Sequence, residues 1–367
     1  MYLLAVKGVQ GLKPYEPGKP LAELEREYGI SNAVKLASNE NPLGMSLKAK
    51  QAAIDAVNNA SLYPDGNAYY LKQALAAHLS GVGSRVDAKQ ITVGNGSNEL
   101  LEIIARCFAS QDAAIMYSQH AFAVYPLITQ AIGASHQMIP AKSWGHDLHA
   151  MRRAVTDKTK IIFIANPNNP TGTFLASLEL LSFIKSLPKN IIVVIDEAYH
   201  EYVDERGYIS AMNWVNDFEN LIVTRTFSKA YGLAGLRVGY CVAHRAMANL
   251  LNRVRQPFNV NVIALAAAEA ALEDRLFIGD SVAINNVGKT QLYRAFDDMA
   301  LNYLPSQGNF IALDLQRAVD EINERLLKRG VIVRPIGAYQ MPTYIRVSVG
   351  TEQQNNKLVA ALRAVLL

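Results

Sequence analysis

Short apolar runs separated by helix-like segments dominate the middle of the chain. The runs occupy residues 91–93, 114–117, 161–165, 191–195, 221–224 and 238–242. Continuous apolar runs of this length are typical of strands that are covered on both faces, as in a parallel sheet with helices outside it. A helical pattern from Ser97 to Phe108 follows the first run. The alternation predicts an α/β fold with a mostly parallel central sheet flanked by helices.

The pattern changes after about Pro257, where we expect a second, smaller α+β domain. An Ala-rich helical stretch extends to about Met299, and strand-like segments follow at 309–313, 331–334 and 344–349, with helices near 321–329 and from about Glu352. The Pro-rich start predicts an extended arm and then a short helix, because proline fixes φ and lacks a donor. We therefore divide the chain into an arm with part of the small domain (1–38), a large domain (39–256) and a C-terminal small domain (257–367).

Charge and composition narrow the possible partners. The net charge is only +4 over 367 residues, without a long basic run, so we do not expect nucleic-acid binding. The apolar start is too short for a signal peptide, and no apolar run reaches the roughly 18 residues of a membrane span. Two cysteines, Cys107 and Cys241, are too few for a disulfide framework or a thiolate metal cluster. We expect a cytoplasmic protein without a metal site.

Polar motifs follow several of the apolar runs, at the edge where open α/β sheets bind ligands. They occupy residues 94–98, 166–172, 196–199 and 226–229, with Arg237 shortly after the last. The first motif offers backbone N–H groups and the Ser97 hydroxyl at a helix N-terminus, which suits a phosphate. It matches neither the dinucleotide fingerprint nor the P-loop, which disfavours a dehydrogenase.

Asp196 and Lys229 add reactive groups to this edge. Asp196 ends an apolar run, and a buried carboxylate is costly without a partner, although a helix cap or loop ion pair is the ordinary alternative. A desolvated lysine near other cations has a lowered pKa, so the neutral amine of Lys229 could attack an aldehyde. Together the motifs meet the needs of pyridoxal phosphate, which requires a lysine for an imine, an acid for its pyridine nitrogen and a phosphate cradle.

The set Asn-Pro-Thr-Gly at 169–172, Asp-Glu-Ala-Tyr at 196–199, Ser-Lys at 228–229 and Arg-Val-Gly at 237–239 resembles the fold-type-I aminotransferases over nearly the whole chain. Segments 13–19, 38–44, 63–65, 309–310 and 344–350 resemble signatures of the histidinol-phosphate aminotransferase family. This resemblance implies transamination of histidinol phosphate with 2-oxoglutarate, giving imidazole-acetol phosphate and glutamate in histidine biosynthesis. Relatives on the same scaffold leave two alternatives open, an aromatic amino-acid (phenylalanine or tyrosine) aminotransferase and a phosphothreonine decarboxylase.

The resemblance also implies roles in binding the cofactor. Lys229 would hold the cofactor covalently and move the substrate proton, and Asp196 would pair with the pyridine nitrogen. Tyr199 and Asn169 would bind the phenolic oxygen of the ring, and Phe122 would stack on its face unless it is an ordinary core residue. The remaining cofactor residues, most of them around the phosphate, would be Gly96, Ser97, Asn98, Thr226, Ser228 and Arg237.

Substrate binding and assembly follow from the same resemblance. Arg346 and Arg334 would bind the substrate phosphate, and Asn169 would also contact substrate. Tyr15 would reach the substrate from the partner subunit, and Tyr63 would reach the cofactor phosphate in the same way. We therefore expect a homodimer with shared active sites, because these two tyrosines are useful only across an interface.

Overall fold

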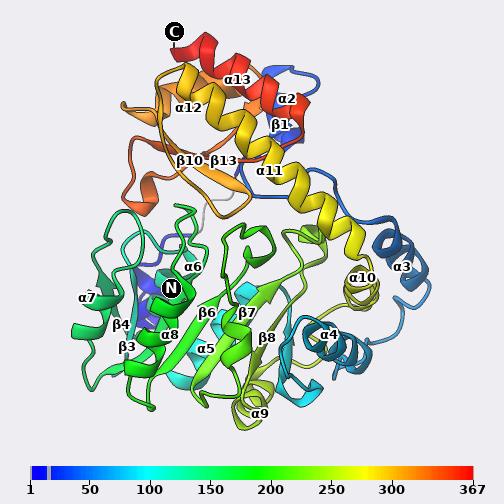
Figure 1. Cartoon of the computed structure of the whole chain (residues 1–367), viewed down its shortest axis with the longest axis vertical. Coiled ribbons are helices and arrows are strands. Elements are labelled where there is room, and N and C mark those ends of the chain that lie inside the picture. The colour runs from blue at the N-terminus through cyan, green and yellow to red at the C-terminus, as the bar shows by residue number, and fades with distance from the viewer. Residues whose placement is uncertain (1, 15–17, 367) are drawn as a thin grey trace.

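A seven-stranded sheet forms the centre of the larger lobe in the computed structural model, which describes residues 2–14 and 18–366 (Figure 1). Its strands are β2 (Ile91–Gly94), β3 (Ala114–Ser118), β4 (Ser135–Ile139), β5 (Thr159–Ala165), β6 (Ile192–Asp196), β7 (Leu221–Thr226) and β8 (Gly239–Ala243). Their order is β2-β8-β7-β6-β5-β3-β4. Only β8 runs antiparallel to its neighbours. The prediction of a mostly parallel α/β sheet is confirmed.

Helices bury both faces of this sheet. Alternate residues of β5 show this, since Ile161 and Phe163 belong to one apolar cluster whereas Ile162 and Ile164 belong to another. The period of two is that of a strand whose successive side chains point to opposite faces. The first cluster includes α5 (Ser97–Phe108), α6 (Val124–Ala131) and α9 (Arg245–Val254). The second includes α3 (Leu47–Val57), α4 (Tyr69–Gly81), α7 (Leu148–Arg153), α8 (Ser177–Ser186) and α10 (Val262–Leu272).

The smaller lobe is built on a four-stranded antiparallel sheet. Its strands are β9 (Asn302–Leu304), β10 (Phe310–Asp314), β12 (Arg334–Pro335) and β13 (Tyr344–Ser348), in the order β12-β13-β10-β9. Side chains of α11 (Arg275–Asp298), α12 (Val319–Leu327) and α13 (Glu352–Leu366) share an apolar cluster with this sheet. The N-terminal part adds α1 (Lys7–Gln10), α2 (Leu21–Tyr28) and β1 (Val34–Lys35), which pairs with β11 (Val331–Ile332).

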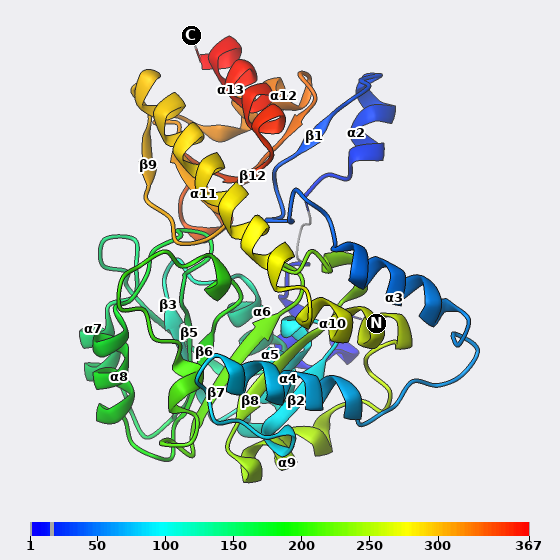
Figure 2. The ribbon, with the colours of Figure 1, turned by 45° about the vertical axis from the view of Figure 1, so that its right-hand side comes forward.

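The Ala-rich stretch predicted after Pro257 forms two helices that serve different lobes. α10 packs against α3 and α4 of the larger lobe, and α11 then crosses to the smaller one (Figure 2). The break occurs where the Asp274 carboxylate caps α11 by accepting from the Phe277 amide at 3.2 Å. The division of the chain into domains near residue 257 stays a prediction.

Several strands differ from the sequence-based expectation, which did not include the short strands β1 and β9. The segment predicted as one strand over 331–334 splits into β11 and β12, which belong to different sheets. The edge strand β4 was not predicted, because its residues are mostly polar and only Ile139 is fully buried. Among the described residues, the helices are too short or too polar to cross a membrane.

The loop after β7, which carries Lys229, depends on a close backbone approach at Gly232. This residue has φ of +72°, and an added Cβ would overlap the carbonyl oxygen of Gly44. Its amide donates to the Lys229 carbonyl at 3.0 Å, so the turn that presents Lys229 is packed directly on residue 44.

Replacing Gly232 with alanine should therefore destabilise the protein more than the same change at Gly207. Gly207 has a similar φ of +80° but open space around it. Gly207→Ala therefore measures only the cost of placing an alanine at a positive φ, which is about 1–2 kcal/mol. We expect Gly232→Ala to lower the free energy of unfolding by a further ~1–3 kcal/mol, since overpacking adds to that cost. Urea denaturation compares the two variants, and equal losses would contradict the packing argument.

Candidate active site

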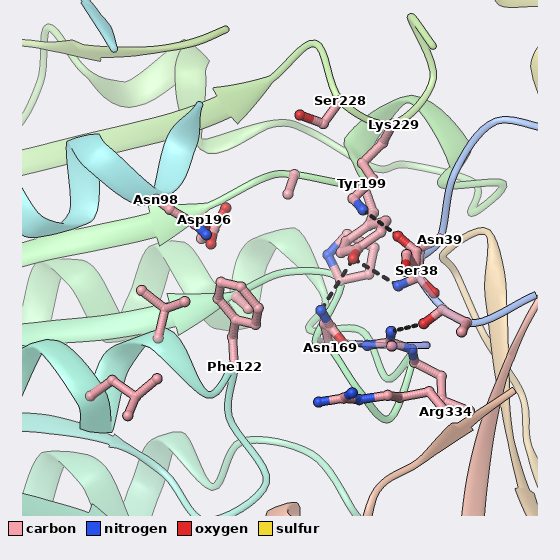
Figure 3. Close-up of a pocket in the computed structure, with 18 of the residues that line it drawn as sticks. Ser38, Asn39, Asn98, Phe122, Asn169, Asp196, Tyr199, Ser228, Lys229 and Arg334 are labelled. Atoms are coloured by element: carbon pink, nitrogen blue, oxygen red, sulfur yellow. Dashed lines mark hydrogen bonds between the residues drawn. The ribbon is translucent and has the colours of Figure 1, made fainter. Parts of the chain in front are cut away.

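A cavity of about 360 Å³ lies between the carboxyl ends of the large sheet and the smaller lobe (Figure 3). This volume is within the range of small-molecule and cofactor sites. Most of the site residues predicted from sequence line it: Asn98, Phe122, Asn169, Asp196, Tyr199, Ser228, Lys229, Arg237, Arg334 and Arg346. Segments far apart in the chain thus meet at one place, as expected of strand ends that share one edge of a sheet.

Lys229 enters the cavity from the loop after β7. Its amine donates to the Ser38 carbonyl at 2.9 Å and lies 5.7 Å from the centroid of the Tyr199 ring. Burial lowers the pKa of Lys229 to about 7, the positive charge of Arg346 adds to the effect, and Glu40 opposes it. A substantial share of the amine is therefore neutral at neutral pH, as a nucleophile or base must be.

Asp196 is the last residue of β6 and lies on the opposite side of the cavity from Arg334 (Figure 3). Its side chain is buried, and its two oxygens accept from Tyr125 at 3.0 Å and from Thr224 at 3.1 Å. Burial raises the pKa of Asp196 to about 6, against the lowering effect of these hydrogen bonds. Sequence reasoning assigned no role to Tyr125 or Thr224, because both look like ordinary core residues.

Tyr199 lies in the middle of a buried hydrogen-bond group. Its hydroxyl accepts from Asn39 at 2.9 Å and from Asn169 at 3.2 Å, which leaves its own proton for a ligand oxygen. Burial raises the pKa of Tyr199 to about 12, so the hydroxyl stays protonated at neutral pH. Asn39 had been noted only as part of a motif, and its contact with Tyr199 was not predicted.

The N-terminus of α5 and Arg237 form a cradle for an anion. A Cβ at Gly96 would lie 2.5 Å from the Arg237 guanidinium, and one at Gly239 would lie 2.7 Å from the Ser97 amide nitrogen. These glycines therefore allow Arg237 to lie against the start of the helix. Arg237 also donates to the Ser228 hydroxyl at 3.1 Å. A helix N-terminus, a guanidinium and hydroxyl groups are the donors that a phosphate prefers.

Arg346 holds the other end of the cavity. Its terminal nitrogens donate to the Asn169 side chain at 2.6 Å and to the Ala37 carbonyl at 2.7 Å. Its buried Nε has no hydrogen-bond partner among the described residues, so this N–H remains for an anionic ligand. Arg334 on β12 lines the same cavity. The side chains of two arginines therefore line one cavity.

The remaining predicted residues lie around the cavity or outside it. Gly96 is the N-cap of α5 and Ser97 is its first residue, directly before Asn98. The Thr226 hydroxyl accepts from the Ser228 amide at 3.1 Å. Tyr63 is 83% exposed and stacks on Phe258, so any contact with a cofactor would need a second subunit. Tyr15 lies outside the described residues. The roles assigned to these residues stay predictions.

The donor set fits pyridoxal phosphate and offers no alternative metal centre. An amine, a buried carboxylate, a phenol and a phosphate cradle surround one cavity large enough for the cofactor. Within 2–14 and 18–366, no three His, Cys, Asp or Glu side chains come together as metal ligands.

Comparison with known proteins agrees with this geometry. Residues 31–362 match the family model of class I and II aminotransferases. The chain is 51% identical to histidinol-phosphate aminotransferase 1 of Nitrosococcus oceani, over 100% of this chain and 97% of that protein. It is also 51% identical to histidinol-phosphate aminotransferase 1 of Idiomarina loihiensis, over 97% and 96% of the two chains.

Solved structures give the same result. The histidinol-phosphate aminotransferase of Sinorhizobium meliloti, solved in complex with pyridoxal-5'-phosphate, matches with a TM-score of 0.89 at 29% identity, over 98% of this chain and 96% of that one. Aspartate aminotransferase of Thermus thermophilus matches with a TM-score of 0.85 at 20% identity, over 98% and 99%, which concerns the fold alone.

The chain belongs to the class I and II aminotransferases, a family of enzymes that use pyridoxal phosphate. Within that family, the full-length relatives named above are histidinol-phosphate aminotransferases. The predicted resemblance, the fold-type-I architecture and the cofactor are therefore confirmed.

The environment of Lys229 predicts how cofactor uptake depends on pH. The neutral amine of Lys229 is the form that would react with the aldehyde of the cofactor, so the uptake rate of the cofactor-free chain should rise as pH increases through about 7. Glu40 raises the pKa of Lys229, so Glu40→Gln should move the midpoint of this rise to lower pH.

Stopped-flow absorbance measures the uptake rates. Glu102→Gln removes an exposed carboxylate that pairs with Arg106 on α5, and it should leave the midpoint where it is. A midpoint that Glu40→Gln does not move would contradict the electrostatic account of Lys229.

Proposed function

We propose that the chain transfers the amino group of histidinol phosphate to 2-oxoglutarate, giving imidazole-acetol phosphate and glutamate in cytoplasmic histidine biosynthesis. The observation that carries the proposal is the pair Arg334 and Arg346 in the cavity that contains Lys229. The names of relatives about half identical over the full length support the same substrate.

The arginine pair suits a phosphate better than a single carboxylate. A phosphate monoester carries close to two negative charges at neutral pH, and guanidinium groups bind its oxygens through charge-assisted hydrogen bonds. Arg346 is held rigidly by Asn169 and by the Ala37 carbonyl, so it loses little freedom on binding. The apolar side chains of Val124 and Leu127 line the same cavity and suit an imidazole ring.

Each side chain has a defined task in the proposed reaction. When bound, the cofactor supplies an electron sink for the pair released from the substrate carbon. The amine of Lys229, neutral once its proton is lost, removes the proton from the substrate α-carbon. The Asp196 carboxylate presents a negative charge at the far side of the cavity, and the Tyr199 hydroxyl donates a hydrogen bond. The 2-oxo acid then passes through the same steps in reverse.

A substrate panel tests the proposal. The purified chain should transaminate histidinol phosphate with a higher kcat/KM than phenylalanine, and Lys229→Ala should abolish turnover while leaving the fold intact. Preference for phenylalanine would support an aromatic aminotransferase instead. Release of carbon dioxide from phosphothreonine as the main activity would support a decarboxylase.

The role of Arg334 gives a sharper prediction. Arg334→Gln should lower kcat/KM for histidinol phosphate about 10–100-fold, because a charge-assisted contact to phosphate is lost. The activity toward phenylalanine, which has no phosphate, should change much less. The exposed Arg329 on the same lobe is the matched control, and Arg329→Gln should leave both activities unchanged. Equal losses for both substrates in Arg334→Gln would contradict phosphate recognition.

We further propose that the chain works as a homodimer in which Tyr63 and Tyr15 complete the partner's site. Exposed apolar side chains support this, since such patches mark interfaces. They lie on α3, on α4 and in the loop between them, and they are Leu47, Ile54, Val57, Leu62, Tyr63, Tyr69 and Tyr70.

Mixed dimers test whether the sites are shared. Lys229→Ala and Tyr63→Ala chains should each have little activity alone, but co-expression should restore up to about one quarter of the wild-type activity, since one site of each mixed dimer is intact. Activity of the mixture that equals the average of the two pure variants would contradict a contribution of Tyr63 across subunits.

A further inference from the structure

Asp196 depends on two hydroxyl groups that sequence reasoning did not single out. Each carboxylate oxygen accepts a hydrogen bond from a hydroxyl group, Oδ2 from Tyr125 at 3.0 Å and Oδ1 from Thr224 at 3.1 Å. Thr224 is the register partner of Asp196 on the neighbouring parallel strand, so both side chains lie on the same face of the sheet. The two donors thus fix the plane of the carboxylate from two different elements, α6 and β7.

The Tyr125 hydroxyl is held in place by rigid packing. The side chain is completely buried, and its ring stacks on Phe163 with centroids 4.7 Å apart and planes inclined by 9°. Its ring also forms a T-shaped contact with the ring of Phe122, which lines the cavity, with centroids 5.9 Å apart. The short segment 122–125, which leads into α6, therefore supplies both an aromatic side chain of the cavity wall and the donor to Asp196.

In the part of the chain that the structure describes, no ion pair joins Asp196 to a cation. The neighbouring carboxylate of Glu197 takes both hydrogen bonds from the buried guanidinium of Arg225, at 3.0 and 2.9 Å. The groups that act on Asp196 are the Tyr125 and Thr224 hydroxyls, the Ala198 amide and the negative charge of Glu197. An ionised carboxylate buried among neutral donors is costly, and each donor removed raises that cost.

We propose that Tyr125 is a positioning residue, whose hydroxyl, with that of Thr224, keeps the Asp196 carboxylate ionised and oriented for the ring nitrogen of the cofactor. The inference rests on the proposed pyridoxal-phosphate-dependent function. Neither Tyr125 nor Thr224 is among the described residues that line the cavity. Both hydroxyl groups act only through Asp196. They keep its carboxylate negatively charged, and a protonated ring nitrogen of the cofactor would then serve as its counter-ion.

The pH dependence of cofactor affinity separates this role from a merely structural one. Below the pKa of Asp196, cofactor binding must first remove a proton from the carboxylate, which weakens the affinity. Tyr125→Phe keeps the ring packing but removes the donor, so Asp196 stays protonated up to a higher pH. The loss of affinity relative to wild type should therefore grow as pH falls and fade as pH rises.

The experiment is equilibrium titration of the cofactor-free full-length chain with pyridoxal phosphate between pH 6 and pH 9, followed by fluorescence. Tyr125→Phe should bind about tenfold more weakly than wild type at pH 6 and less than about threefold more weakly at pH 9. Thr224→Val, which removes the donor to the other oxygen, should change the profile in the same direction and provides the test if Tyr125→Phe fails to fold.

Tyr117→Phe is the matched control. Tyr117 is a buried tyrosine of the same sheet, and its hydroxyl contacts His136 at 2.6 Å, so the variant should keep the wild-type profile. A loss of affinity in Tyr125→Phe and Thr224→Val that is equal at every pH, or no loss at all, would overturn the role of the two hydroxyls. A wild-type chain that does not bind the cofactor would overturn the proposed function as well, whereas the first result leaves that function standing.

Discussion

Desolvation at the carboxyl edge of the large sheet is the constraint on which the site depends. Burial raises the pKa of Asp196 to about 6 and lowers that of Lys229 to about 7, so the two pKa values approach neutral pH from opposite directions. In water, an aspartate and a lysine would be fully charged at pH 7. The same burial that makes the amine reactive also makes the carboxylate costly, and the hydroxyl donors around Asp196 offset that cost.

The site also requires that both lobes line the same cavity. Asn39 connects them, because its backbone amide donates to the Ser348 hydroxyl at 2.8 Å and its side chain donates to Tyr199 at 2.9 Å. Arg346 adds a second link through Asn169. The smaller lobe thus contributes the arginines, the larger lobe contributes the reactive groups, and buried hydrogen bonds fix their relative position.

The hydrophobic pattern and the motifs that follow apolar runs were sufficient to predict the elements and site residues that depend on local sequence. The helix from Ser97 to Phe108 has the predicted limits, and the motifs after the strands meet at one edge because parallel strands end there. The missed features depend on contacts over long sequence separation. Tyr125 reads as an apolar helix residue until Asp196 is placed beside it, and the segment 331–334 divides only because its ends pair with different strands. Mostly polar β4 has no apolar run to reveal it.

One lysine and one carboxylate must serve a single bound cofactor if this chain is to act as proposed. The most direct measurement is reduction of the purified, cofactor-loaded chain with borohydride, followed by peptide mapping by mass spectrometry. The account predicts one pyridoxyl group per chain, attached to Lys229, in the wild type and none at that position in Lys229→Ala. A label distributed over several surface lysines, or one attached reproducibly to a lysine outside the cavity, would contradict it.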